Sequence, residues 1–76
     1  MKKLNCCILL KTVPTKIYSI VDAIKKIEGV KKCYITYGRF DVVAFIEVSN
    51  YDEVRVISTK INELDGIRST ETLVEG

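Results

Sequence analysis

The stretch Ile24–Lys31 (IKKIEGVK) recurs as Ile61–Arg68 (INELDGIR), so the pattern returns from position 24 to position 61, an offset of 37 residues. Each copy reads as the end of an amphipathic helix, a glycine and the first residues of a strand. Two units as long as this 37-residue offset nearly fill the chain of 76 residues. The sequence therefore predicts two similar halves joined by the segment Tyr37–Asp41.

The residues before the first copy extend this pattern. Leu4–Lys11 is a continuous apolar run, which is typical of a strand buried on both faces. Apolar residues then recur at the three- and four-residue spacing of a helix, at Ile17, Ile20, Val21, Ile24 and Ile27. Pro14 suits the first turn of this helix, because its missing N–H would have no partner there. Gly29 is expected to end the helix.

The remaining chain supplies three more strands and a second helix. The strands are rich in β-branched and aromatic residues and span Val30–Tyr37, Val42–Val48 and Ile67–Val74. The second helix is expected to begin after Asn50, which is followed three residues later by Glu53 as in a capping box. It is expected to end at Gly66, as the first helix ends at Gly29. Its buried stripe is Val54, Ile57, Ile61 and Leu64.

The order of elements is strand, helix, strand, strand, helix, strand. Right-handed crossovers place both helices on one face of a single sheet. We therefore predict an α+β, ferredoxin-like βαββαβ fold with one four-stranded antiparallel sheet, spanning residues 1–76 as one domain. The first and third strands are expected at the centre because they are the most apolar, and the second and fourth at the edges.

The central strands are apolar on both faces. Ile8 and Leu10 alternate with Cys7 and Leu9, although the helices would cover only one side of the sheet. Strands that are apolar on both faces need cover on both. The sequence therefore predicts an obligate homodimer that pairs sheet to sheet.

Composition narrows the classes of function. The chain has 12 basic and 10 acidic side chains and a net charge of +2, which is weak support for a nucleic-acid binder. It has no histidine, and Cys6, Cys7 and Cys33 follow no metal or redox spacing. No segment is apolar over the ~18 residues that a membrane helix needs. We expect a cytoplasmic protein without metal, other cofactors, membrane partner or enzymatic activity.

Two groups of residues stand out as candidate binding positions. In the hairpin between the second and third strands, Gly38 allows close approach of the backbone and Asp41 supplies a carboxylate. On the last strand, Thr70 and Thr72 point the same way. From residue types alone, an ordinary hairpin turn and a threonine-rich edge strand are the favoured interpretations.

With these residues in view, the chain resembles the effector-binding domain of the Lrp/AsnC (feast/famine) regulators, which is called the RAM domain. The resemblance rests on Gly38 and Asp41, on the apolar strand and helix that follow, and on Gly66-Ile67 with the Thr-x-Thr of Thr70 and Thr72. It covers essentially the whole chain.

The resemblance implies a ferredoxin-like sheet paired face to face in dimers, with a free amino acid bound between dimers of a larger ring. The hairpin and the last strand would line that cleft. Asp41 would accept a hydrogen bond from the ammonium group of the effector, while backbone N–H groups around Gly38 or the threonine hydroxyls would donate to its carboxylate. The implied ligand-binding residues are Gly38, Arg39, Phe40, Asp41, Thr70 and Thr72.

Full-length regulators of this family carry an N-terminal helix-turn-helix domain, whereas this chain starts at the first strand. It therefore resembles a stand-alone form that is expected not to bind DNA itself. Such a form would sense an amino acid, or co-assemble with full-length Lrp/AsnC regulators and modulate transcription. Two alternatives remain open: an assembly-only module that forms oligomers without ligand, and another ferredoxin-like regulatory domain of the ACT type.

Overall fold

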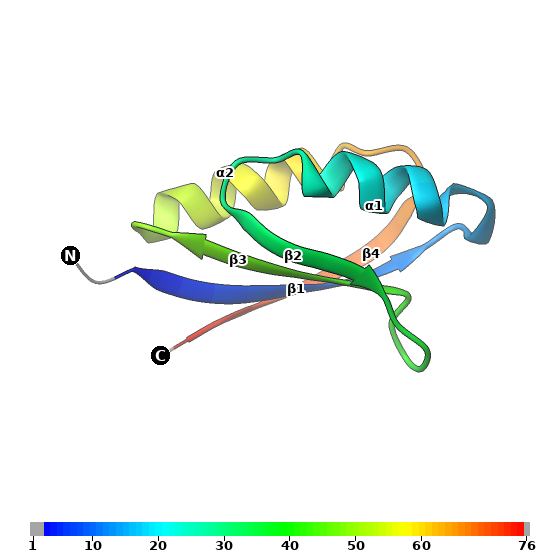
Figure 1. Ribbon diagram of the computed structural model, residues 1–76, viewed down its shortest axis with the longest axis horizontal. Coiled ribbons are helices and arrows are strands. Elements are labelled where there is room, and N and C mark those ends of the chain that lie inside the picture. The colour runs from blue at the N-terminus through cyan, green and yellow to red at the C-terminus, as the bar shows by residue number, and fades with distance from the viewer. Residues whose placement is uncertain (1–2, 76) are drawn as a thin grey trace.

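The computed structural model of the chain describes residues 3–75 (Figure 1). Its elements are β1 (Leu4–Thr12), the 3₁₀ helix η1 (Pro14–Lys16), α1 (Ile17–Lys25), β2 (Val30–Ile35), β3 (Val42–Val48), α2 (Tyr51–Asn62) and β4 (Ile67–Val74). This order confirms the predicted βαββαβ arrangement. Residues 1, 2 and 76, which the predicted domain includes, lie outside the described residues.

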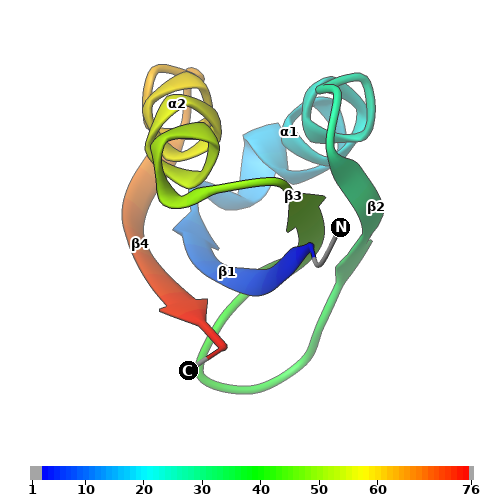
Figure 2. The same ribbon diagram turned by 90° about the vertical axis from the view of Figure 1, so that its left-hand side faces the viewer.

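The four strands form one antiparallel sheet in the order β2-β3-β1-β4. The apolar strands β1 and β3 are central and the more polar β2 and β4 are edges, as predicted. Both helices lie on the same face, and the other face of the sheet is open (Figures 1 and 2). The register places Ile8 between Ala44 of β3 and Thr72 of β4. This is the ferredoxin-like α+β fold that the sequence predicts.

The hydrophobic core fills the space between the sheet and the helices. The alternating residues of β1 and β3 that point to the helices are buried, and the helices contribute one apolar stripe each. The largest fully buried side chains are Ile8, Leu10, Ile20, Ile24, Val42, Ile46 and Ile61. Burying each such side chain contributes roughly 1.5–3 kcal/mol. This single layer therefore supplies most of the hydrophobic stabilisation within one copy of the domain.

Both helices end earlier than predicted. α1 ends at Lys25 and α2 at Asn62, whereas Gly29 and Gly66 lie further along the chain. The two glycines have positive φ angles of 101° and 98° and turn the chain into the next strand. Each helix is followed by a short turn that keeps the apolar pattern going, which explains why periodicity alone overestimates the helix length.

The internal repeat extends to tertiary contacts. A Cβ atom on Gly29 would lie 3.0 Å from Cδ1 of Ile57, and a Cβ atom on Gly66 would lie 3.2 Å from Cδ1 of Ile20. Ile20 and Ile57 are separated by the same offset as the two glycines. α1 of the first half therefore packs against the glycine turn of the second half, and α2 of the second half packs against the glycine turn of the first half.

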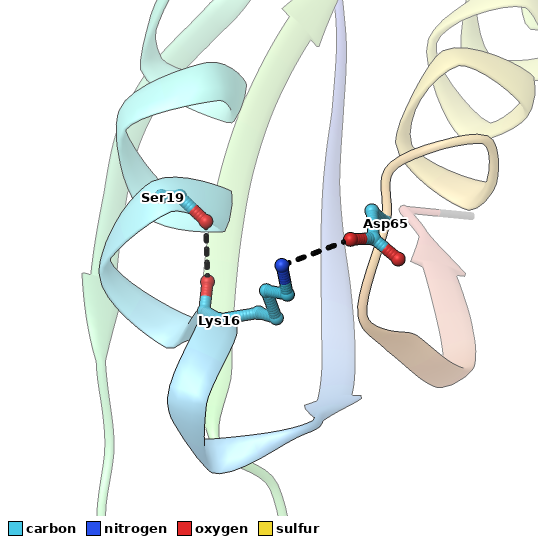
Figure 3. A network of polar contacts seen from close by, with 3 residues as sticks. All are labelled: Lys16, Ser19 and Asp65. Carbon is cyan, nitrogen blue, oxygen red and sulfur yellow. Dashed lines mark hydrogen bonds and ion pairs between the residues drawn. The ribbon is translucent and has the colours of Figure 1, made fainter.

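Gly66 is the tighter of the two contacts. A Cβ atom there would approach Cβ of Lys16 to 2.6 Å, so no larger side chain fits without a shift of η1. Lys16 then reaches over the turn, and its Nζ lies 3.1 Å from Oδ2 of Asp65, while its carbonyl accepts a hydrogen bond from the Ser19 hydroxyl at 2.9 Å (Figure 3). These contacts join the end of the α2–β4 connection to η1 at the protein surface.

Candidate functional site

The predicted hairpin is a projecting loop. β2 ends at Ile35, two residues before the predicted Tyr37, and the chain between β2 and β3 extends away from the helices (Figures 1 and 2). Thr36 closes its base, because its backbone N–H donates to the Asp41 carbonyl at 2.9 Å and its hydroxyl donates to the Phe40 carbonyl at 2.7 Å. The loop therefore leaves the sheet at a fixed point and reaches past its open face.

Asp41 links the hairpin to the neighbouring strand β1. Its Oδ2 accepts a hydrogen bond from the backbone N–H of Thr12 at 2.9 Å, and its own N–H donates to the Leu10 carbonyl at 2.8 Å. One carboxylate oxygen is thus already used within the fold. Among residues 3–75, no hydrogen bond reaches the other oxygen, Oδ1. Asp41 has a structural role here and retains one acceptor for a further partner.

The other hairpin residues are exposed or half-buried. Gly38 has a φ of 146°, and an added Cβ would meet no atom within 4 Å. Arg39 is exposed and belongs to none of the ion pairs of the described chain. Phe40 is half-buried, with Nζ of Lys11 5.9 Å from its ring centroid, within the range of a cation–π contact. The hairpin therefore offers a cation and an aromatic ring on an exposed arm.

Thr70 and Thr72 lie on the opposite side of the sheet. They pair with Leu10 and Ile8, whose side chains point to the helices, so the threonines share that face. The hydroxyl of Thr70 donates to Oδ1 of Asn62 at 3.1 Å, and the hydroxyl of Thr72 lies 3.5 Å from that of Ser58. The predicted common direction of the two threonines is confirmed.

The α2–β4 polar row, which we define as Ser58, Asn62, Thr70 and Thr72, includes two residues that the sequence analysis missed. Ser58 and Asn62 are four positions apart on α2 and so share a side of that helix. Their spacing was visible in the sequence. Their position beside the threonines depends on how α2 lies against β4, which no local pattern reveals.

The hairpin and the α2–β4 polar row do not meet within one copy. β1 lies between β3 and β4, so the strands that carry Asp41 and Thr70 are two strand spacings apart, about 10 Å. The hairpin also extends to the open side, whereas the threonines face the helix side. A ligand that touched both groups with its ammonium and carboxylate would need residues from a second copy.

A groove of about 450 Å³ lies elsewhere, where the α1–β2 turn, the end of β3 and the start of α2 converge. Its charged lining includes Glu28, Lys31, Glu47 and Lys60, of which Lys31 and Glu47 form an ion pair at 3.6 Å. None of the predicted ligand-binding residues lines it.

The cysteines are free thiols without a shared site. Cys6 and Cys33 are buried and Cys7 is partly exposed, and burial raises the pKa of all three. The pKa of Cys33 rises to about 11. Within residues 3–75 there is no group of three or more His, Cys, Asp or Glu side chains placed to hold a metal ion, and no helix long and apolar enough to cross a membrane.

The model of the family described as the Lrp/AsnC ligand binding domain matches residues 5–75. The chain belongs to this family. An uncharacterized HTH-type transcriptional regulator of Pyrococcus abyssi is 34% identical over 56 residues, which cover 72% of this chain and 37% of the relative. The match thus spans about a third of the length of that regulator. The resemblance seen in the sequence is confirmed.

Solved structures agree with the fold of this Lrp/AsnC-type domain. TTHA0845 from Thermus thermophilus superimposes with a TM-score of 0.93 and 24% identity, and the match covers 96% of this chain and 92% of that one. AsnC of E. coli has a TM-score of 0.85 and 24% identity over 95% of this chain and 50% of its own. The siroheme decarboxylase NirDL has a TM-score of 0.84 and 16% identity, and shares the fold over 95% of this chain and 25% of its own.

Proposed function

We propose that this domain is a regulatory module that binds a free amino acid between copies of itself. The family to which it belongs is defined by ligand binding, and its relatives include transcription regulators. The observation that carries the proposal is the separation of the hairpin from the α2–β4 polar row. The hairpin carries a carboxylate oxygen suited to the ammonium end of an amino acid, and the polar row carries hydroxyls suited to its carboxylate end. The two groups can meet only when copies assemble.

In this proposal the hairpin of one copy meets the α2–β4 polar row of another. Oδ1 of Asp41 accepts from the ammonium group of the effector, and Arg39 or the hydroxyls of Thr70 and Thr72 bind its carboxylate. Phe40 supplies an apolar wall that selects the side chain. The proposed ligand-binding residues are therefore those predicted from the sequence. The single O–H of Thr70, which donates to Oδ1 of Asn62 in the free domain, turns to the effector carboxylate on binding.

We further propose that the unit of assembly is a homodimer paired through the open sheet face, with dimers joined into a ring. The apolar residues left on that face by the fold support the pairing. Full-length Lrp/AsnC regulators share the domain and are proposed partners in mixed assemblies, through which this chain would modulate transcription without contacting DNA. Three free thiols suit the reducing cytoplasm.

A catalytic role is not favoured, although one protein with this fold is a decarboxylase. The chain has no histidine for general acid–base chemistry. Its thiols are held in the neutral form by burial, which weakens them as nucleophiles. We propose a non-enzymatic domain that uses no metal or other cofactor.

The test is thermal unfolding in the presence of each of the twenty amino acids. A ligand that binds only the folded assembly at 100 times its Kd adds about 2.7 kcal/mol of stability, which is a readily measured rise in Tm. We expect one amino acid or a small chemical class to raise the Tm. The double variant Thr70→Val and Thr72→Val should lose this rise while keeping the size of the assembly.

One observation favours a second candidate, an assembly module without ligand. Asp41 is already bound by the Thr12 amide, so its identity is explained by the fold alone. In that case no amino acid at millimolar concentration would shift the Tm, and the ring would form in the absence of any effector. The match to the Lrp/AsnC family favours this alternative over an ACT-type domain.

A further inference from the structure

The groove of about 450 Å³ beside α2 shares no residue with the proposed amino-acid site. It opens at the end of the molecule that faces the viewer in Figure 2, and its volume lies within the roughly 300–1,000 Å³ of small-molecule sites. Val48 and Ile57 form its floor and are buried. Val56 forms part of its wall and keeps 53% of its surface accessible. The groove therefore has an apolar lining that a ligand can cover.

Gly29 brings the α1–β2 turn against this floor. A Cβ atom on Gly29 would lie 3.0 Å from Cδ1 of Ile57 and 3.4 Å from Cγ1 of Val48. The carbonyl of Gly29 accepts a hydrogen bond from the Glu47 N–H at 2.9 Å. The turn that forms one wall is thus bonded to β3 and packed against α2. The groove is therefore complete within one copy, unlike the proposed amino-acid site.

The charged side chains of the groove carry both signs in equal number: Lys3, Lys31, Lys60, Glu28, Glu47 and Glu53. Lys31 and Glu47 form an ion pair at 3.6 Å. Oε1 of Glu53 accepts a hydrogen bond from the Ser49 N–H at 2.6 Å, next to the first turn of α2. The fold itself therefore uses one cation and one and a half of the three carboxylates.

The groups that remain are two cations and two anions. Among residues 3–75, the side chains of Lys3, Lys60 and Glu28 take part in no ion pair or hydrogen bond. Within the same range, no hydrogen bond reaches Oε2 of Glu53. A nucleotide would bring several negative charges beside the carboxylates, and a polyamine would bring several positive charges beside the lysines, which is unfavourable. A ligand that carries one charge of each sign matches the groove.

α2 sets the distance between opposite charges. Four lining residues share one side of this helix, because they follow the i, i+3, i+4, i+7 spacing: Glu53, Val56, Ile57 and Lys60. Glu53 and Lys60 are therefore roughly 10 Å apart along the helix axis. The ammonium and carboxylate groups of a free amino acid are attached to one carbon, so they do not span this distance. An extended peptide of three residues spans about 10 Å.

We propose that the groove binds a short peptide of about three residues with free ends. Lys60 binds its carboxylate, Oε2 of Glu53 accepts a hydrogen bond from its ammonium group, and an apolar side chain of the peptide covers Val56. The inference does not rest on the proposed amino-acid site, because it uses none of the residues of that site. A single copy then holds a peptide whether or not copies assemble.

The test is isothermal titration calorimetry with the tripeptide Ala-Leu-Ala and two blocked forms of it. One form is acetylated at the amino end, and the other is amidated at the carboxyl end. We expect the free peptide to bind, and each blocked form to bind about tenfold more weakly, because each loses a hydrogen bond between charged groups. Equal affinities for the free and blocked peptides, or no binding of Ala-Leu-Ala at millimolar concentration, would overturn the proposal.

Two variants locate the ends of the peptide. Lys60→Gln should weaken binding of the free peptide about tenfold but leave the amidated form unchanged, since that form has already lost this contact. Glu53→Gln should do the same with the acetylated form, and glutamine keeps an oxygen for the Ser49 N–H. Lys25→Gln and Glu63→Gln alter exposed charges outside the groove and should bind the free peptide as the wild type does. Circular dichroism checks the fold of each variant.

The double variant Thr70→Val and Thr72→Val separates this site from the proposed amino-acid site. We expect it to bind Ala-Leu-Ala with the wild-type Kd. Loss of peptide binding in this variant would place the peptide at the α2–β4 polar row and overturn the groove as its site. A protein that binds Ala-Leu-Ala through Lys60 but no free amino acid would support the groove and contradict the proposed function.

Discussion

The two faces of the sheet are built from the same strands but differ in how far their side chains are buried. On the helix-covered face, Ile8 and Leu10 are 1% and 0% exposed, whereas on the open face Phe45 and Leu73 keep 38% and 50% of their surface accessible. Alternation along a strand sends neighbouring residues to opposite faces. The covered face therefore holds one copy together, while the open face has apolar area available for assembly. Variants that act on one face and not the other test this division.

The largest effect is expected on the covered face. Leu10→Ala removes a fully buried side chain at the centre of the core and should lower the free energy of unfolding by about 2–5 kcal/mol. Urea unfolding followed by circular dichroism measures the loss. Leu9→Ala, on the adjacent residue of the same strand, is the control. If the proposed dimer forms, the effect of this variant should depend on protein concentration, because it acts through the interface. Equal, concentration-independent losses would contradict the division between faces.

The second effect is loss of assembly without loss of fold. Phe45→Asp places a charge in the middle of the open face and should convert the proposed dimer to a folded monomer, because burying an unpaired carboxylate is costly. Sedimentation equilibrium gives the mass and circular dichroism the fold. Val56→Asp alters an exposed apolar residue on α2 and should leave the mass unchanged. A dimer that survives Phe45→Asp would show that the open face is not the interface.

The third effect concerns the hairpin, where the Asp41 carboxylate binds the backbone of β1. Asp41→Ala leaves the Thr12 amide without its acceptor, which should cost about 1–3 kcal/mol of stability. Hydrogen exchange of that amide should become faster, as read by NMR. Asp41→Asn keeps an oxygen that can accept this bond and should restore most of the protection. If both variants exchange as slowly as the wild type, the side chain does not hold β1.

The smallest effect is a pH dependence within the covered face. Burial raises the pKa of Cys33 from its ordinary value of 9.0 to about 11, so the folded state keeps a proton that the unfolded chain releases. The contribution of this pKa difference to the free energy of unfolding is full below pH 9 and is lost as pH rises through about 11. Stability should therefore fall across this window. Cys33→Ala should reduce that slope in denaturant unfolding, and an unchanged slope would assign the effect to other groups.

The order of elements and the central position of β1 and β3 were predictable because they depend on local periodicity and on which strands are apolar on both faces. The ends of the helices were not, since the turns at residues 26–29 and 63–66 continue the apolar pattern of the helices before them. The placement of Gly38 in a hairpin and of the Thr-x-Thr on β4 likewise follows from local sequence.

The contacts made by the candidate site residues were harder to predict from the sequence. Asp41 binds the amide of Thr12, 29 residues earlier in the chain, and no local pattern encodes that contact. The neighbours of Thr70 and Thr72 on α2 depend on the packing of a helix on an edge strand. Whether the predicted ligand-binding residues bind an amino acid stays a prediction, because the hairpin and the α2–β4 polar row lie apart within one copy.

The reciprocal contacts of Gly29 with Ile57 and of Gly66 with Ile20 make each βαβ half the scaffold of the other. The strands interleave in the same way, since β1 of the first half lies between β3 and β4 of the second. Folding of the domain should therefore not require an unbroken chain through the exposed hairpin. Two peptides, residues 1–38 and 39–76, should be unstructured when separate and should recover the whole domain by complementation when mixed.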